Sequence, residues 1–99
     1  MLAVLVDADN LSAAHADRLL AWAATKHPQR IVQIFGDFTD NRASQWCALA
    51  RTKGFELIFQ PNGGAGKNST DIALVIRAMD LLHQGVVRAF CLASNDRDF

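Results

Sequence analysis

The chain has 99 residues, of which 51% are hydrophobic and 20% are charged. This length accommodates one small domain, and the apolar content is enough for a core, so the composition excludes a disordered tail or linker. Ten basic residues balance ten acidic residues. Because a neutral chain has no bulk attraction to nucleic acid, any such binding must depend on local patches or on bound metal.

We expect a cytoplasmic protein that does not cross a membrane. The apolar segment at residues 1–6 is too short, and too soon followed by an acid, to be a signal peptide. No apolar run in the sequence is long enough to span a bilayer. Cys47 and Cys91 are the only cysteines, and we interpret them as buried thiols in a reducing compartment.

Apolar runs alternate with helical patterns along the whole chain. Strands are expected at residues 2–6, 31–35, 55–59 and 86–92, and the first of them reads as a strand buried on both faces. Helices are expected at residues 11–26, 40–53 and 69–83. The pair His27-Pro28 ends the first helix and Gly54 ends the second. In the third helix we expect the core-facing side to carry Ile72, Val75, Ile76 and Met79.

This order of elements predicts an α/β three-layer sandwich of the Rossmann-like type. Right-handed crossovers place helices on both faces of a parallel sheet, for which we predict the strand order 3-2-1-4. We treat residues 1–99 as a single domain. A doubly wound domain would continue past Phe99 with a helix and a strand, so we expect a C-terminally truncated domain. Its fourth strand would be an exposed edge through which the chain could form a homo-oligomer.

Four aspartates occupy the ends or beginnings of these elements. Asp7 closes the first strand, Asp71 opens the third helix, and Asp96 and Asp98 follow the fourth strand. In the predicted sheet the first and fourth strands are neighbours where the strand order reverses, which is where such sheets bind ligands. Carboxylates that gather there need a cation between them. Mg²⁺ or Mn²⁺ is the natural ion and a phosphodiester the natural substrate.

Simpler structural roles compete with this reading at several positions. Asp9 has the spacing of a cap on the first helix, and we favour that role over metal binding. Asp71 would be stabilised by the helix dipole in any case. Asp37 ends the second strand and is a candidate outer member of the acidic set, as Asp9 is. Residues 94–98 are compatible with an ordinary polar turn.

The loop at residues 61–68 has strong turn chemistry but not the spacing of a phosphate-binding loop, because Pro61 stands where the first glycine should be. We expect Lys67 either to contact a substrate phosphate or to form part of a mobile lip. The other candidate substrate-binding residues are Arg97, Arg42, Asn68 and Ser94. Phe38 is a candidate stacking surface for a base.

Four segments of the chain together resemble a known family, the NYN domain. They are VDADN, FGDF, GKNSTDIALVIRAMDLL and CLASNDRDF, at residues 6–10, 35–38, 66–82 and 91–99. The resemblance is to the LabA-like branch of the PIN-like nuclease superfamily. It implies a three-layer α/β fold and cleavage of RNA that depends on Mg²⁺ or Mn²⁺.

The resemblance also implies roles for individual residues. By position, Asn10 matches the asparagine that follows the first strand in the family, and the acidic quartet corresponds to Asp7, Asp71, Asp96 and Asp98. Arg77 is a departure, because close relatives often carry an acid there. Asn95 and Arg97 replace small residues that are common in the last motif.

We therefore expect a metal-dependent ribonuclease in which the four aspartates hold one or two ions that orient an attacking water. One alternative is a non-catalytic module that binds RNA or a nucleotide. A second alternative is a haloacid-dehalogenase-like phosphatase with Asp7 as the nucleophile. Against the phosphatase, Gly36 and Asp37 occupy the tip of the second strand, where that class carries Ser or Thr.

Overall fold

The structure is a computed structural model that describes residues 1–61, 69–85 and 87–94. Each expected helix and strand is present in these ranges. The elements are β1 (Leu2–Asp7), the 3₁₀ turn η1 (Ala13–His15), α1 (Ala16–Lys26), β2 (Arg30–Gly36), α2 (Asn41–Lys53), β3 (Glu56–Phe59), α3 (Ser69–Gln84) and β4 (Ala89–Ala93). The first α-helix begins later than predicted, because the chain first forms η1. No helix of the described ranges is long and apolar enough to span a membrane.

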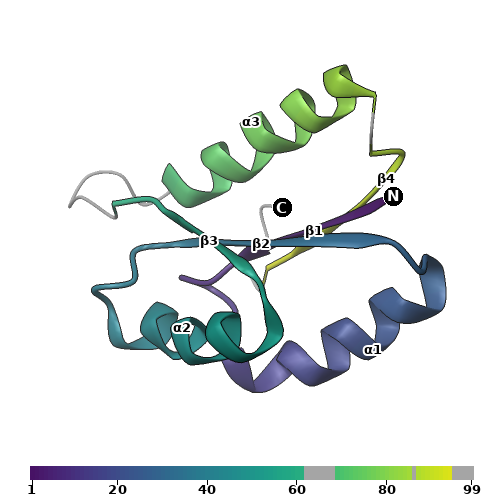
Figure 1. Ribbon diagram of the computed structural model, residues 1–99. Helices are drawn as coiled ribbons and strands as arrows, with labels where there is room; N and C mark the ends of the chain where they lie inside the picture. The colour runs from purple at the N-terminus through teal and green to yellow at the C-terminus, as the bar shows by residue number, and fades with distance from the viewer. Residues whose placement is uncertain (62–68, 86, 95–99) are drawn as a thin grey trace.

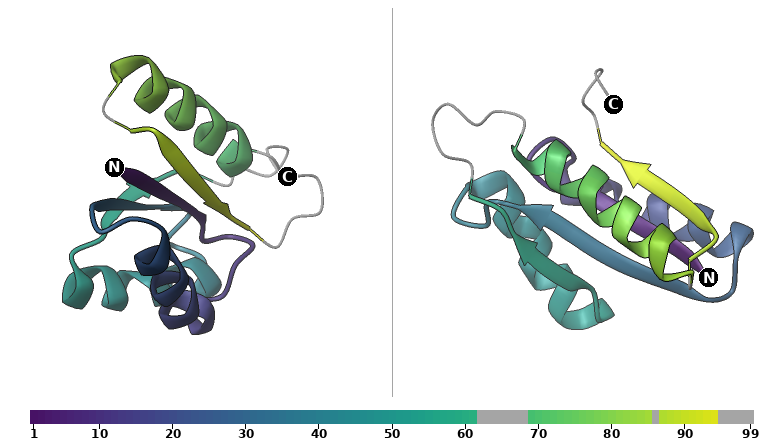
Figure 2. Two further views of the ribbon diagram at one scale, coloured as in Figure 1. Left: turned by 90° about the vertical axis from the view of Figure 1, so that its right-hand side faces the viewer. Right: turned by 90° about the horizontal axis from the view of Figure 1, so that it is seen from above.

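The described strands form one parallel sheet in the order β3-β2-β1-β4, as predicted (Figure 1). Helices α1 and α2 cover one face of this sheet and α3 covers the other (Figures 1 and 2). In the central strand, Val6 pairs with Ile34 of β2 and with Ala93 of β4, and Asp7 pairs with Phe35. The carboxyl ends of these three strands therefore reach the same edge of the sheet.

The core lies on both sides of β1, which is buried from Leu2 to Asp7. On the side of α1 and α2, Val4 and Val6 belong to a cluster that includes Trp46. On the side of α3, Leu5 packs in a second cluster with Phe35 and Leu74. A strand that packs on both faces must be apolar at every position, which is why residues 2–6 form a continuous apolar run.

Local sequence signals place the ends of the helices. Helix α1 ends at Lys26, because His27 adopts extended angles (φ −157°, ψ 135°) before Pro28. The Asp40 side chain accepts a hydrogen bond from the Arg42 N–H and caps the start of α2. Gly54 follows α2 in the left-handed region at φ 74°, a conformation that favours glycine.

The predicted inward face of α3 is wrong. Ile72, Val75, Ile76 and Met79 are between 47% and 58% exposed, and they point away from the sheet. The buried side chains of α3 are Thr70, Leu74 and Leu81. The cysteine prediction needs a smaller correction, because Cys47 and Cys91 are free thiols that are half-buried rather than buried.

The rotation of α3 has two physical causes. The helix is apolar around most of its circumference, so its periodicity is compatible with more than one inward face. The observed face brings Leu74 and Leu81 against Ala3, Leu5 and Phe35 of the sheet. It also lets polar groups pair: the Arg77 Nε donates to Gln33 Oε1 on β2 at 3.1 Å.

Candidate active site at the carboxyl edge of the sheet

Asp7 is a fully buried carboxylate at the end of β1. Its Oδ2 accepts hydrogen bonds from Asn10 Nδ2 at 2.8 Å and from Ser94 Oγ at 3.1 Å. Its Oδ1 accepts the Asp9 N–H at 3.1 Å. A buried charge is tolerated only when polar partners replace its lost hydration, and these donors supply that compensation.

The bond from Ser94 joins two strands that are far apart in sequence. Ser94 directly follows β4, and β4 is the neighbour of β1 on the side opposite β2. The strand order reverses between these two strands, and open α/β sheets bind ligands at that point. Asp7 therefore lies where the topology predicts a site.

Asp9 connects three other parts of the same edge. Its Oδ1 accepts the Asp37 N–H at 3.0 Å, and its Oδ2 accepts the Thr70 hydroxyl at 2.6 Å. The prediction that Asp9 caps the first helix is wrong, because Ser12 accepts from the Ala14 N–H and caps η1. Asp9 instead links the end of β1 to the end of β2 and to the start of α3.

Glycine at position 36 permits this close approach. A Cβ atom at Gly36 would lie 3.1 Å from Asp9 Oδ1 and 3.1 Å from Ala8 Cβ. These contacts are tighter than normal van der Waals separations, and Ala8 is itself buried. A larger residue at position 36 would therefore push β2 away from the Asp9 carboxylate.

Asp71 is in the first turn of α3, directly after Thr70, and its Oδ1 is buried. The hydrogen bond from Thr70 to Asp9 holds this turn beside the end of β1. The amino end of α3 and the carboxyl end of β1 lie on the same side of the molecule (Figure 1). The structure thus brings Asp71 to the edge that carries Asp7.

The remaining candidates have other described contacts, are exposed, or fall outside the described ranges. The Asp37 carboxylate takes part in the turn that leads to α2, where Oδ1 accepts the Thr39 N–H at 3.1 Å. Arg42 is exposed on α2, and Phe38 packs partly against the core. Five predicted residues lie outside the described ranges: Lys67, Asn68, Asp96, Arg97 and Asp98.

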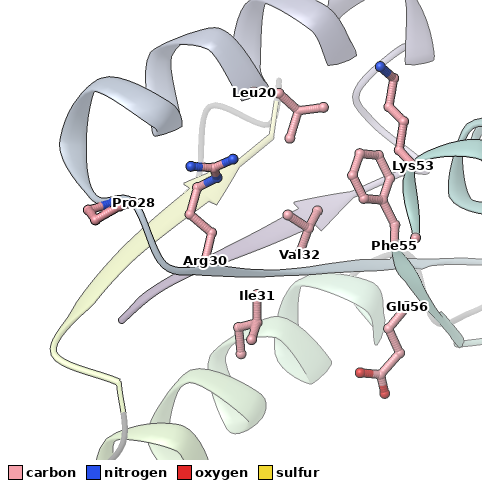
Figure 3. A pocket seen from close by; sticks show the side chains of 9 residues that line it. Leu20, Pro28, Arg30, Ile31, Val32, Lys53, Phe55 and Glu56 are labelled. Carbon is pink, nitrogen blue, oxygen red and sulfur yellow. The ribbon is translucent and has the colours of Figure 1, made fainter.

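A cavity of about 570 Å³ lies at the opposite, amino edge of the sheet (Figure 3). Its charged lining residues are the cations Arg30 and Lys53 and the acid Glu56. Both cations already have partners, because Arg30 Nη1 donates to the His27 carbonyl at 3.1 Å and Lys53 pairs with Asp17 at 3.5 Å. We therefore place the candidate active site at the carboxyl edge, around Asp7.

The comparison with protein families agrees with this geometry. The model of the NYN domain matches residues 1–99. The chain belongs to the NYN domain family. NYN domains are part of the PIN-like nuclease superfamily and are generally ribonucleases, and PIN-like nucleases generally use divalent metal ions. No curated protein and no solved structure matches the chain.

The oxygen atoms at this edge of the NYN domain are of the chemical type that divalent cations bind. The carboxylates of Asp7 and Asp71 and the hydroxyl of Ser94 are hard oxygen donors, which Mg²⁺ and Mn²⁺ prefer. Within residues 1–61, 69–85 and 87–94, no group of three or more His, Cys, Asp or Glu side chains is placed to hold a metal ion. Two of the four acids expected in the metal site, Asp96 and Asp98, lie outside these ranges.

Sequence reasoning missed two contributions to the site. Thr70 was not a candidate, although its hydroxyl tethers α3 to Asp9. The sequence could have indicated this role, because Thr70 carries a hydroxyl group and directly precedes Asp71, a predicted metal ligand. The predicted contact of Ser94 with substrate stays a prediction, and sequence reasoning did not anticipate that its hydroxyl donates to Asp7.

Proposed function

We propose that this NYN domain is a divalent-metal-dependent ribonuclease of the LabA-like branch, which hydrolyses phosphodiester bonds in RNA. The observation that carries the proposal is the buried Asp7 carboxylate at the reversal point of the sheet, with Asp71 brought to the same edge. Burying a carboxylate is costly. A site that needs a fixed negative charge provides a reason to keep Asp7 there.

The metal-holding residues in this proposal are Asp7, Asp71, Asp96 and Asp98. These residues would hold a Mg²⁺ or Mn²⁺ ion, which would supply Lewis-acid chemistry at the scissile phosphate and offset negative charge there. Asn10 and Ser94 fix the orientation of the Asp7 carboxylate through their bonds to Oδ2, and such outer partners usually tune metal affinity. We assign phosphate contacts to Lys67, Arg97, Arg42 and Asn68, which would give little base selectivity.

The hydrogen bonds at this edge argue against the phosphatase alternative. Asp9 is the second acid that such a mechanism would use as a proton donor. It already accepts hydrogen bonds from Thr70 and Asp37.

The proposal is tested by the substitution Asp7→Asn, with cleavage of a labelled single-stranded RNA measured in Mn²⁺. Asn keeps the shape of the side chain but removes its charge, so we expect the rate to fall on the order of 100-fold or more. The matched control is Asp80→Asn, an exposed acid on α3, which should cleave at the unaltered rate. Circular dichroism verifies that both variants fold.

Two results would contradict the proposal. One is an Asp7→Asn protein that cuts RNA as fast as the original chain. The other is an original chain that binds RNA in Mn²⁺ without cutting it. That second outcome would favour the non-catalytic binding module.

A further inference from the structure

A groove with a volume of about 560 Å³ runs between α1 and the edge strand β4. On the helix side it is lined by His15, Arg18 and Trp22, and on the strand side by Cys91, Ala93 and Ser94. Ser94 is the residue whose hydroxyl donates to Asp7. One end of this α1–β4 groove therefore adjoins the candidate active site.

The helix side of the groove carries a stripe of basic residues around an aromatic ring. His15, Arg18, Trp22 and Lys26 are spaced three or four residues apart, so they follow one side of the helical segment. The Lys26 Nζ lies 5.4 Å from the centre of the Trp22 ring, a cation–π arrangement. This contact adds a third basic residue beside the ring.

Within the described residues, the acid of α1 does not cancel the positive charges of Arg18 and Lys26. Asp17 is the only acid of α1, and it pairs with Lys53 of α2, away from the groove. Burial raises the pKa of the Cys91 thiol, so that wall of the groove is uncharged at neutral pH. The described lining of the groove is largely apolar and carries the positive charge of Arg18, and Lys26 adds a second cation beside Trp22.

The two tryptophans of the chain differ in a way that suggests a ligand. Trp46 is 1% exposed and donates its Nε1–H to the Leu11 carbonyl at 2.9 Å, as a core indole does. Trp22 leaves 46% of its surface exposed beside Arg18 and Lys26. An exposed aromatic ring among cations is the arrangement with which proteins stack the bases of single-stranded nucleic acid.

We propose that the α1–β4 groove binds a single-stranded segment of RNA and guides it to Asp7. Trp22 stacks on one base, while Arg18, Lys26 and His15 face the phosphates. This inference rests on the proposed ribonuclease function and adds the surface that holds the RNA. Duplex RNA does not fit the role, because its bases are stacked on one another and cannot lie against an indole. Stacking tolerates every base, so the groove is not sequence-specific.

The length of α1 sets how much of the RNA can lie along the groove. Helix α1 has 11 residues and is therefore about 16 Å long at 1.5 Å per residue. Its amino end lies at the carboxyl edge of the sheet, since a helix that joins parallel strands runs opposite to them. The bound RNA would therefore pass His15 last before it reaches Ser94 and Asp7.

The test is the binding of a fluorescein-labelled oligouridine, measured by anisotropy in EDTA so that metal-dependent cleavage does not occur. Trp22→Leu removes the aromatic plane but keeps apolar bulk, and we expect affinity to fall roughly 10-fold. Trp22→Phe keeps a ring and should retain most of the affinity. Arg18→Glu should weaken binding more than Arg51→Glu, which makes the same change in charge on the exposed side of α2.

Intrinsic fluorescence provides a second measurement. Stacking should quench the emission of the original chain on RNA addition. Trp22→Phe should show no quenching although it still binds, because the remaining Trp46 is buried. Quenching that persists in Trp22→Phe would overturn the stacking assignment.

Other outcomes separate this proposal from the ribonuclease proposal. If Trp22→Leu and Arg18→Glu bind RNA as tightly as the original chain, or if a duplex of the same length binds equally well, the groove proposal fails even if the chain cuts RNA. If the groove variants lose binding but the original chain does not cut RNA in Mn²⁺, the groove proposal stands and the nuclease proposal fails.

Discussion

At the scale of single residues, Asp9 has a larger structural role than its exposure suggests. The partners of its carboxylate are the Asp37 N–H, 28 positions away, and the Thr70 hydroxyl, 61 positions away. Through them Asp9 holds the ends of β1 and β2 and the start of α3 together. Asp9 is thus a positioning residue, because it fixes where Asp71 stands relative to Asp7.

We expect Thr70→Val to lower both stability and activity. Valine has the shape of threonine but no hydroxyl, so Asp9 Oδ2 would lose its 2.6 Å partner. The loss should reduce the free energy of unfolding by about 1–3 kcal/mol, measured by urea denaturation. It should also raise the Mn²⁺ concentration needed for half-maximal cleavage.

The control for this prediction is Thr70→Ser, which keeps the hydroxyl and should restore the metal dependence of the original chain. A Thr70→Val protein whose metal dependence is unchanged would show that the bond to Asp9 does not position Asp71. In that case the bond has only a structural role.

The sequence was enough to single out Asp7 as a candidate site residue, but it did not predict the structural role of Asp9. An acid that ends a buried apolar strand has few structural reasons to be there, so its position alone predicted a functional role. Asp9 has a spacing that also suits a helix cap, and local spacing gave the wrong role. Its true partners come from β2 and α3, which only the folded chain brings together.

At the scale of elements, α3 shows where periodicity fails. The strands and the ends of the first two helices could be predicted, because β1 is buried on both faces and His27-Pro28 and Gly54 stop the helices. Helix α3 is apolar on opposite sides, so its pattern did not specify its rotation. The observed rotation depends on the fit of Leu74 against the sheet and on the bond between Arg77 and Gln33.

Substitutions on the two sides of α3 should differ strongly in stability. Leu74 is fully buried, and Leu74→Ala should cost about 2–5 kcal/mol of unfolding free energy because it leaves a cavity. Ile76 is 57% exposed, and Ile76→Ala should cost less than about 1 kcal/mol. Urea denaturation of both variants measures the difference. Equal losses would contradict the observed rotation of the helix.

At the scale of the whole molecule, acidic and basic side chains of the described residues occupy separate places although the net charge of the chain is zero. The carboxyl edge of the sheet holds Asp7, Asp9 and Asp71, while Arg18 and Lys26 stand along the α1–β4 groove beside it. A metal site and an anionic strand need these two environments next to each other. The strand order that makes them neighbours follows from alternating elements and right-handed crossovers, so this part of the fold could be predicted from sequence.

Other whole-molecule properties stay predictions. Homo-oligomerisation through β4 is one of them, since β4 is an edge strand of the described sheet. The roles of Asp96 and Asp98 are another, because both lie outside the described ranges. Sequence position assigns these two acids to the metal site, and the placement of Asp7 and Ser94 at the adjoining strand ends is consistent with that assignment.

The most direct test of the central claim is a titration of the isotope-labelled chain with Mn²⁺, followed by paramagnetic broadening of its amide signals. A divalent ion at the carboxyl edge should broaden the amides of Asp7, Asn10, Asp71 and Ser94 first. The amide signals of Arg30 and Glu56, at the amino edge, should stay sharp. In Asp7→Asn the selective broadening at the carboxyl edge should be lost. Broadening that begins at the amino edge, or that is unchanged in Asp7→Asn, would contradict a metal site built on Asp7.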